Sequence, residues 1–345
     1  MCLFFLLFLI TVSQLTSYFS VVLDADGKPT EEERVDGRPD PRFLKEHGLT
    51  RDSHPVEFVD AFLPVYDKKR GVNRRTKYTT SVEVLCKWSN AKAILMGMGT
   101  DACYPKFKPF DVKEFEKHLY FYYFNGLNPS PRVQMKFKTN DDDPVQGNNF
   151  INRVFGSGAG RRHREWKCCF ATQDPLVTPP SRKTHPNWKI DPFLKHVQEV
   201  SRAGWLLARY FSLDEQTAGF KGRHVDKKRI TYKKEGDGFQ MDAICDRGFT
   251  YAYYMRNQLA PKKYLDQGLS PLHARCMSLF DTLKDSYHEA NFDNLYTSTK
   301  FAFFSYVHHP KKVKTQGVIR SGGKGCPAEV VQREEADKKN AEKVR

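Results

Sequence analysis

The chain has 345 residues, of which 13% are aromatic, and this length is sufficient for one large or two ordinary domains with a buried core. Its eight cysteines are scattered and form no CxxC pair. This spacing argues against a disulfide-framed secreted domain and predicts reduced, mostly buried thiols in an intracellular protein.

Basic residues outnumber acidic residues. Lys and Arg together number 56, Asp and Glu number 41, and the formal net charge is +15. Such an excess of cations favours a polyanionic partner such as DNA, because phosphate contacts release counterions. A merely basic, soluble surface explains the same charge, so composition alone leaves both interpretations open.

The first 22 residues form an apolar segment without a charged residue. The run MCLFFLLFLITV is shorter than the ~20 residues that span a bilayer. It is similar to the apolar part of a secretory signal, but it lacks the positive segment that precedes one. Three interpretations stay open: sequence translated from upstream of the true start, a real signal or anchor, and a buried helix. We expect membrane association or secretory targeting only under the second.

Residues 23–54 are polar and contain several prolines and glycines, which predicts a linker or a disordered arm. Beyond them, the spacing of apolar residues predicts a short amphipathic helix over Glu57–Tyr66 and a longer helix over Val112–Asn125. The basic cluster between Lys68 and Lys77 can contact phosphates or can be a solvated loop. The acidic patch Thr139–Asp143 is predicted to be a turn.

A glycine-rich segment, Gly156–Gly160, precedes a run of basic residues. It lacks the GK[ST] ending of a phosphate loop, so we do not expect it to bind a nucleotide. A glycine-rich turn with several arginines can instead hold the phosphates of a nucleic acid backbone, which makes Arg161 and Arg162 candidate DNA contacts. The thiols of Cys168 and Cys169 are predicted to belong to the core.

The second half of the chain predicts alternating strands and helices. The proline-rich segment Pro175–Trp188 marks a boundary, and a helix is predicted to begin at Asp191. A strand then leads into Asp214, followed by a hairpin, a helix, the acid Asp293, a second helix capped by Thr297 or Ser298, and a short strand. The predicted ranges are Gln240–Asp246 and Phe249–Met255 for the hairpin, Pro271–His288 and Thr297–Val307 for the helices, and Thr315–Arg320 for the last strand.

Asp214 and Asp293 each stand where an apolar run gives way to a polar turn. Carboxylates delivered from strand ends into one pocket are how proteins hold hard divalent cations such as Mg²⁺ or Mn²⁺. Taken alone, an acid at a strand end is better explained as the cap of a turn. The other acids close enough in sequence to be metal ligands are Glu215, Asp242 and Asp246.

Five sequence blocks favour the metal-binding interpretation, because they resemble the core of the piggyBac transposases in order and spacing. They are LDEQ at 213–216, FKGR at 220–223, Cys245-Asp246, DNLYTS at 293–298, and Gly317-Val318-Ile319-Arg320 with Gly325 and Pro327. The resemblance covers about residues 190–330. It implies an α/β fold with a ribonuclease H-like (DDE transposase) core, incomplete at its C-terminal end, that follows a mainly helical N-terminal domain.

The resemblance also implies the chemistry. The first two catalytic acids of the family correspond to Asp214 and Asp293, and the third belongs to a later VDxxD block that this chain lacks. Three carboxylates would hold two cations, Mg²⁺ or Mn²⁺, for in-line displacement at phosphorus. We therefore predict a transposase-derived, DNA-binding protein that is inactive as it stands. The alternatives are a domesticated, non-catalytic DNA-binding protein and an active transposase whose third acid is Glu329, Glu334, Glu335 or Asp337.

Partners, location and domain limits follow from the same resemblance. The expected partners are DNA, in the form of transposon ends, and a second copy of the chain, and the expected location is the nucleus. Besides Arg161 and Arg162, the candidate DNA contacts are Lys221, Arg223, Arg320 and Lys324. The implied domains are residues 55–190 for the helical domain, 191–330 for the core and 331–345 for a charged tail.

Overall fold

The computed structural model describes residues 37–50, 52–53, 57, 61, 66–67, 72–73, 82–101, 103–127, 137, 158–220, 222–229, 237–318, 328–329, 332–333 and 336. The apolar segment 1–22, half of the predicted arm 23–54 and the acidic patch 139–143 lie outside these residues. The described half of the arm is not a disordered linker, since it contains a short strand at Arg38–Pro39 and a helix at Pro41–His47. Within the described residues, no helix is both long enough and apolar enough to cross a membrane.

The chain divides into two compact units. One consists of Met1–Val21 and Pro41–Gly204, and the other of Val22–Asp40 and Trp205–Arg345. The domain limits implied by the family resemblance stay predictions. We describe the two units separately.

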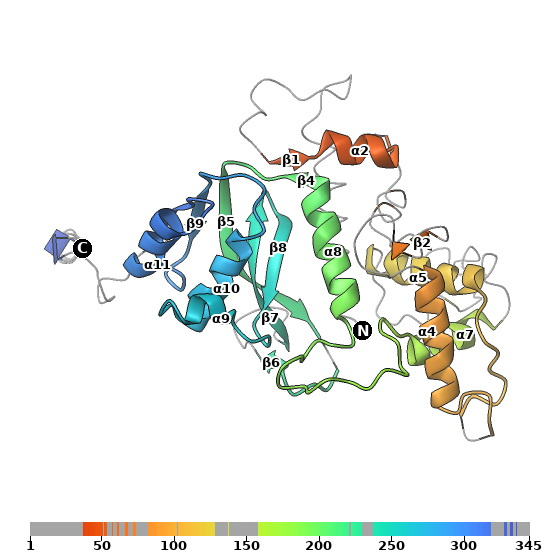
Figure 1. Ribbon diagram of the computed structural model, residues 1–345. Helices are drawn as coiled ribbons and strands as arrows, with labels where there is room; N and C mark the ends of the chain where they lie inside the picture. Colours follow the sequence, from red (N-terminus) through yellow and green to blue (C-terminus); the bar gives the residue numbers. More distant parts are fainter. Residues whose placement is uncertain are drawn as a thin grey trace, which may run out of the picture. The chain divides into compact units, whose positions relative to one another are not determined.

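The described part of the first unit is mainly helical (Figure 1). Rings from two of its segments pack in the core: Phe115 lies 5.8 Å from Trp166 and 5.9 Å from Phe170, measured between ring centroids. The elements are α2 (Pro41–His47), α4 (Val82–Leu95), α5 (Val112–Leu127), α7 (Ala159–Cys169), α8 (Asp191–Gly204) and the antiparallel pair β2 (Tyr66–Asp67) and β3 (Val72–Asn73).

Two predicted helices of this unit are confirmed, since α5 begins at Val112 and α8 begins at Asp191. The predicted helix over 57–66 lies mostly outside the described residues, and Tyr66 at its end belongs to strand β2. The glycine-rich turn is shorter than predicted. Gly158, at φ 80°, precedes the first residue of α7, so the arginines that follow stand on a helix rather than in a turn.

The second unit is built around a six-stranded mixed sheet (Figure 1). The strand order is β10-β9-β5-β7-β6, and β8 also pairs with β7. Pairing is parallel among β5, β9 and β10 and antiparallel among the others. The strands are β5 (Tyr210–Gly219), β6 (Lys228–Arg229), β7 (Asp237–Asp246), β8 (Phe249–Met255), β9 (Glu289–Phe292) and β10 (Lys314–Gly317).

Helices connect the strands that run parallel. Helix α9 (Lys262–Leu265) and helix α10 (Pro271–Phe280) lie between β8 and β9, and α11 (Thr299–Phe303) with a π-helix (Phe304–His308) lies between β9 and β10. A short pair, β1 (Arg38–Pro39) with β4 (Trp205–Leu206), precedes the sheet. This order of elements is the one expected of a ribonuclease H-like core: three antiparallel strands, a helical connection, a parallel strand, a helix and a last parallel strand.

Aromatic packing identifies the face of the sheet that the helices cover. Phe280 of α10 lies 6.1 Å from Phe211 of β5, and Phe301 of α11 lies 5.7 Å from Phe292 of β9. Because successive side chains of a strand point to opposite faces, Ser212 and Asp214 point away from these helices. Both are exposed, whereas their neighbours in β5, Phe211 and Leu213, are buried.

The hairpin and the helix after Asp293 are confirmed. Arg247 and Gly248, at φ 49° and 83°, connect β7 and β8, and two residues with positive φ are what a type I′ turn requires. Of the two candidate caps, Ser298 is the one used, since its hydroxyl accepts a hydrogen bond from Phe301 N–H. The predicted last strand over Thr315–Arg320 is confirmed as β10, but it begins one residue earlier, at Lys314, and already ends at Gly317.

Two predicted limits are wrong. Strand β5 does not end at Asp214 but continues to Gly219, because its pairing with β7 persists to the last residue. Helix α10 ends at Phe280 rather than at His288. Hydrogen bonds from Tyr287 N–H to the Lys311 carbonyl (2.8 Å) and between His288 Nδ1 and the Ala208 carbonyl (2.9 Å) hold the following segment in a non-helical path.

Candidate metal and DNA-binding site

Strand register brings Asp214 and Asp293 together. The last residues paired between the parallel strands β5 and β9 are Leu213 and Phe292. Asp214 is the next residue within β5, and Asp293 is the first residue after the end of β9. Neighbouring strands lie about 4.8 Å apart, and residues in register point to the same face. The two carboxylates, which stand 79 positions apart in the sequence, are both exposed and directly follow the last paired residues of these strands.

Each carboxylate keeps one oxygen available. Asp214 Oδ1 accepts a hydrogen bond from Glu215 N–H (2.6 Å), and Asp293 Oδ1 accepts one from Leu295 N–H (2.9 Å). No hydrogen bond or ion pair within the described residues engages either Oδ2. Carboxylate oxygens are suitable ligands for a hard cation, so this pair fits part of an Mg²⁺ or Mn²⁺ site.

The turn that carries Asp293 is fixed by its neighbours. Thr297 Oγ1 donates to the Asp293 carbonyl (2.8 Å), and strand β10 passes close by at Gly317. A Cβ added at Gly317 would collide with Thr297 Oγ1 and would lie 2.8 Å from the Phe292 carbonyl oxygen. Glycine at this position is what lets β10 approach the acid-bearing turn.

We expect Gly317→Ala to destabilise the β9–β10 region by about 1–3 kcal/mol, because the added methyl group overpacks a close backbone contact. Hydrogen–deuterium exchange of the β9 and β10 amides measures the effect locally. The control is Gly204→Ala, where the new Cβ would lie 3.5 Å from the Phe43 ring, an ordinary contact. Equal protection of the β9 and β10 amides in the wild-type protein and in Gly317→Ala would contradict the prediction.

The other acids proposed as metal ligands have structural partners. Asp242 is fully buried and accepts hydrogen bonds from Arg256 (2.6 and 2.8 Å) and Arg275 (2.9 Å). Glu215 pairs with the same Arg256. Asp246 accepts from the indole of Trp205 (3.0 Å) and from a backbone N–H (2.9 Å), and burial raises its pKa. All three carboxylates therefore already bond to arginine, indole or backbone groups of the fold.

The Asp242 network also reaches the acid pair. Tyr296, three residues after Asp293, donates its hydroxyl to Asp242 (2.9 Å), and its carbonyl lies 3.1 Å from His273 Nε2. The Asp293 turn is therefore anchored to the buried centre of the unit. The sequence did not predict this positioning role, because Tyr296 is remote from Asp242 in the chain. The place of Tyr296 within the DNLYTS block was the available signal.

No third acid joins the pair in the part of the chain that the structure describes. No group of three or more His, Cys, Asp or Glu side chains able to hold a metal ion is found there. Glu329 is described and exposed, whereas Glu334, Glu335 and Asp337 lie outside the described residues.

Of the DNA contacts predicted in the second unit, the structure describes Arg223. It is exposed in a turn before β6, and no ion pair engages it within the described residues. Lys228 and Arg229, the two exposed residues of β6, extend this basic segment and were not predicted. The run Lys227-Lys228-Arg229 was the available sequence signal. Lys221, Arg320 and Lys324 lie outside the described residues.

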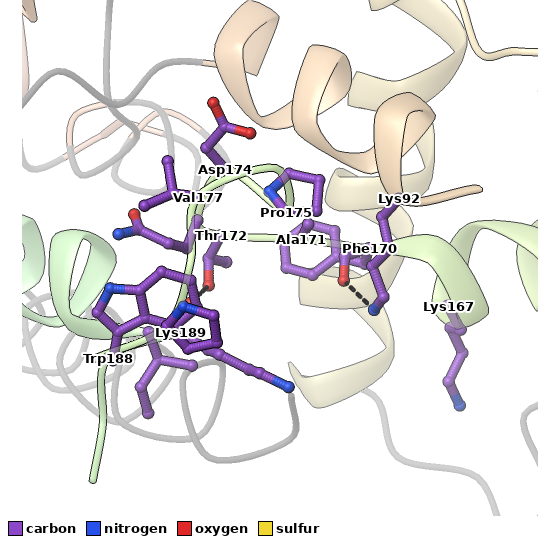
Figure 2. A pocket seen from close by; sticks show the side chains of 13 residues that line it. Lys92, Lys167, Phe170, Ala171, Thr172, Asp174, Pro175, Val177, Trp188 and Lys189 are labelled. Atoms are coloured by element: carbon purple, nitrogen blue, oxygen red, sulfur yellow. Dashed lines mark hydrogen bonds between the residues drawn. The ribbon is translucent and has the colours of Figure 1, made fainter. Parts of the chain in front are cut away.

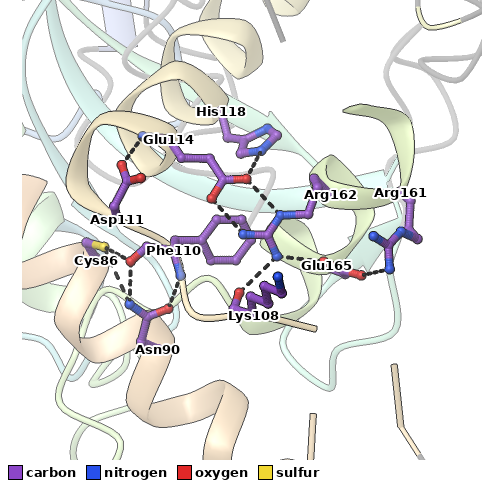
Figure 3. A network of polar contacts seen from close by, with 10 residues as sticks. All are labelled: Cys86, Asn90, Lys108, Phe110, Asp111, Glu114, His118, Arg161, Arg162 and Glu165. Atoms are coloured by element: carbon purple, nitrogen blue, oxygen red, sulfur yellow. Dashed lines mark hydrogen bonds and ion pairs between the residues drawn. The ribbon is translucent and has the colours of Figure 1, made fainter. Parts of the chain in front are cut away.

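In the first unit, Arg161 and Arg162 differ in what they contact (Figure 3). Arg162 donates to both carboxylate oxygens of Glu114 (2.7 and 2.6 Å), to Glu165 (2.7 Å) and to the Lys108 carbonyl (2.9 Å). Among the described residues Arg161 makes a single ion pair, 3.3 Å from Glu165, and its side chain is exposed. The Arg162 guanidinium is thus committed to the fold, and Arg161 is the more available cation.

The first unit also has a pocket of about 490 Å³ beside the end of α7 (Figure 2). Phe170, Trp188 and several prolines provide apolar walls, and three lysines lie among them. The Lys92 ammonium donates to the Phe170 carbonyl (3.0 Å), and burial lowers its pKa. No residue predicted from the sequence as a metal or DNA ligand lines this pocket.

Comparison with known proteins agrees with the geometry. The sequence matches the family model described as transposase IS4 over residues 68–343, well over half of the chain. The structure is similar to a piggyBac transposase determined by cryo-electron microscopy in a synaptic complex with hairpin DNA, with a TM-score of 0.54 and 17% identity. The match covers 73% of this chain and 50% of that one, so the chain spans half the length of that transposase. No curated protein matches.

A mixed sheet of this order, in a chain that matches this family model, is a core of the DDE transposase type. The chain belongs to the IS4 transposase family. Both the predicted resemblance to piggyBac transposases and the predicted α/β fold class with a ribonuclease H-like core are thereby confirmed.

Proposed function

We propose that this transposase-derived chain binds DNA and that Asp214 and Asp293 are two ligands of a divalent cation, Mg²⁺ or Mn²⁺. The main support is the register of β5 against β9, which makes the two acids neighbours on an exposed face. A divalent cation held there would stabilise negative charge on a phosphodiester oxygen.

The chain's own residues have three roles in this proposal: they bind the metal, hold the Asp293 turn in position, and contact phosphates. The carboxylates offer their free oxygens, and the network of Asp242, Arg256 and Tyr296 holds the Asp293 turn in position. Arg223 and Arg161 lie on exposed surfaces where phosphates can reach them. We assign the same role to Lys221, Arg320, Lys324 and, as the least available member, Arg162. By resemblance, the nucleus is the proposed location and a second copy of the chain is a proposed partner.

We further propose that the chain does not cut DNA by itself. Two carboxylates form a weak Mg²⁺ site, because this ion retains its waters and demands octahedral coordination. A third carboxylate would be needed to hold two cations about 3.5–4 Å apart for in-line displacement. Glu329, Glu334, Glu335 and Asp337 are the residues that would supply it if the chain were an active enzyme.

We expect the wild-type chain to bind Mn²⁺ weakly and Asp214→Asn to weaken that binding at least about tenfold, since loss of a ligand costs no less than loss of a residue that orients one. Electron paramagnetic resonance of free Mn²⁺ measures the binding. Asp237→Asn on β7 is the matched control, because its carboxylate is exposed and, among the residues that the structure describes, pairs only with Lys227. Equal Mn²⁺ affinity in the wild-type protein and in Asp214→Asn would refute the metal assignment.

The wild-type chain and Asp214→Asn also test whether the protein cuts DNA. We expect salt-sensitive binding to duplex DNA and no metal-dependent nicking in either protein. Nicking by the wild-type chain that Asp214→Asn abolishes would instead establish the active enzyme. Failure to bind duplex DNA at any salt concentration would remove DNA as the partner.

A further inference from the structure

A hollow of about 510 Å³ lies at the opposite end of the parallel strands from the acid pair. Its lining residues Arg209, His288 and Lys314 stand at the start of β5, β9 and β10, whereas Asp214 and Asp293 follow the last paired residues of β5 and β9. The remaining lining residues are Ser286, Tyr287 and Tyr306. The volume is within the range of about 300–1,000 Å³ that is usual for small-molecule sites.

Two exposed tyrosines in unusual backbone conformations form the walls of this hollow. The side chain of Tyr287 is 64% exposed and its φ is 65°, a value that bulky side chains rarely adopt. Tyr306 is 43% exposed and belongs to the π-helix Phe304–His308. Both features are unfavourable locally and are enriched at functional sites. Here both occur in residues that face the same hollow.

The charge inside the hollow is mainly positive. No hydrogen bond or ion pair within the described residues engages the Lys314 ammonium or the two tyrosine hydroxyls. Arg209 uses one guanidinium nitrogen to pair with Glu289 (2.7 Å), and its guanidinium lies 5.5 Å from the Tyr210 ring centre. His288 is buried and bonds to the Ala208 carbonyl. Lys314 and the remaining donors of Arg209 are therefore available to an anion.

Backbone hydrogen bonds hold the walls in place without a ligand. Tyr287 N–H donates to the Lys311 carbonyl (2.8 Å), which joins the loop before β9 to the loop before β10. Val313 N–H donates to the Ser305 carbonyl (3.0 Å), which joins the start of β10 to the π-helix. The site is therefore preformed, and binding a ligand would cost little conformational entropy of the loops that form it.

We propose that this hollow binds an unpaired nucleotide of single-stranded DNA. The base stacks on the rings of Tyr287 and Tyr306, and the phosphate pairs with Arg209 and Lys314. Exposed aromatic rings beside cations are the usual means of binding single strands, because every base has a face to stack on. Bases inside a duplex are already stacked, so a duplex would leave both rings unused. The inference rests on the proposed function only in taking DNA as the partner.

The test compares a fluorescent thymidine oligonucleotide with a duplex of the same length, by fluorescence anisotropy at low salt. We expect Tyr306→Ala and Lys314→Glu each to weaken binding of the single strand about tenfold and to leave the duplex affinity unchanged within about twofold. The controls are Phe303→Ala, an exposed aromatic residue of the same helical segment, and Lys262→Glu, an exposed lysine of α9. Neither control residue lines the hollow.

Tyr287→Gly separates binding from stability. Glycine adopts a positive φ without strain, so we expect the melting temperature to stay equal or to rise while single-strand affinity falls about tenfold. A variant that loses both stability and binding would assign Tyr287 a structural role and overturn its part in the site.

The possible failures can be told apart. If the lining variants bind the single strand as tightly as the wild-type protein while duplex binding persists, the hollow is not the site and the proposed function is untouched. If the wild-type chain binds only the single strand and the lining variants abolish this binding, the hollow stands and the proposed duplex binding falls. Tighter binding of a poly-glutamate peptide than of the single strand would overturn the choice of nucleic acid.

Discussion

Asp242→Asn is expected to destabilise the second unit by about 3–5 kcal/mol, the usual cost of removing one member of a buried ion pair. The Asp242 carboxylate is fully buried, and it is the shared acceptor of Arg256, Arg275 and the Tyr296 hydroxyl. Asparagine retains the shape but removes the negative charge. Arg256 would keep only Glu215 as an ionic partner, and Arg275 would lose the one ion pair it makes among the described residues.

Hydrogen–deuterium exchange of the β7 amides is the appropriate measurement, because it reports the opening free energy of this unit separately from the other. Asp237→Asn is the matched control on the same strand. Its carboxylate is exposed and pairs with Lys227 at 3.1 Å, so we expect a change below about 1 kcal/mol. Similar protection factors in the two variants would show that the Asp242 network contributes little.

The same substitution reaches the acid pair. Tyr296 links Asp242 to the turn that carries Asp293, so loss of the carboxylate removes one anchor of that turn. We expect Mn²⁺ binding to weaken in Asp242→Asn although Asp242 is not a ligand. Tyr296→Phe is the milder test, since it removes the hydroxyl and leaves both arginines paired.

Local sequence patterns were sufficient to predict most helices and strands of the second unit. The Arg247-Gly248 pair predicted the hairpin turn, because glycine adopts the positive φ of such a turn without strain. The cap of α11 was narrowed to two neighbouring hydroxyls and is Ser298. What these patterns could not give was where an element ends. Strand β5 continues past Asp214 because β7 lies beside it, and helix α10 stops early because distant carbonyls bind the next segment.

The candidate site was likewise predictable from the sequence only in part. Family resemblance identified Asp214 and Asp293, but only strand register makes them neighbours. The sequence left Asp242 open as an alternative metal ligand, since spacing along a strand cannot reveal that two arginines from later segments donate to it. In the same way, a run of arginines predicted phosphate contacts at both Arg161 and Arg162, without indicating which guanidinium the fold would use.

The different contacts of Arg161 and Arg162 also predict a large effect on stability. Arg162→Ala is expected to destabilise the first unit by about 3–5 kcal/mol. Arg162 is 17% exposed, and its removal leaves the fully buried Glu165 with the more distant Arg161 as its ion-pair partner. Burial lowers the pKa of His118 to about 4 and that of His163 to about 3, so neither histidine is charged at neutral pH and neither can replace the lost cation.

Arg161→Ala is the matched control on the same helix. Its side chain is 44% exposed, and we expect a change in stability below about 1 kcal/mol together with a decrease of about one in the salt-dependence slope of DNA binding. Exchange of the α7 amides measures stability, and anisotropy at several salt concentrations measures the slope. If Arg162→Ala leaves α7 protected and instead reduces the slope, the guanidinium serves DNA rather than Glu165. A slope that neither variant changes would exclude α7 from the DNA-binding surface.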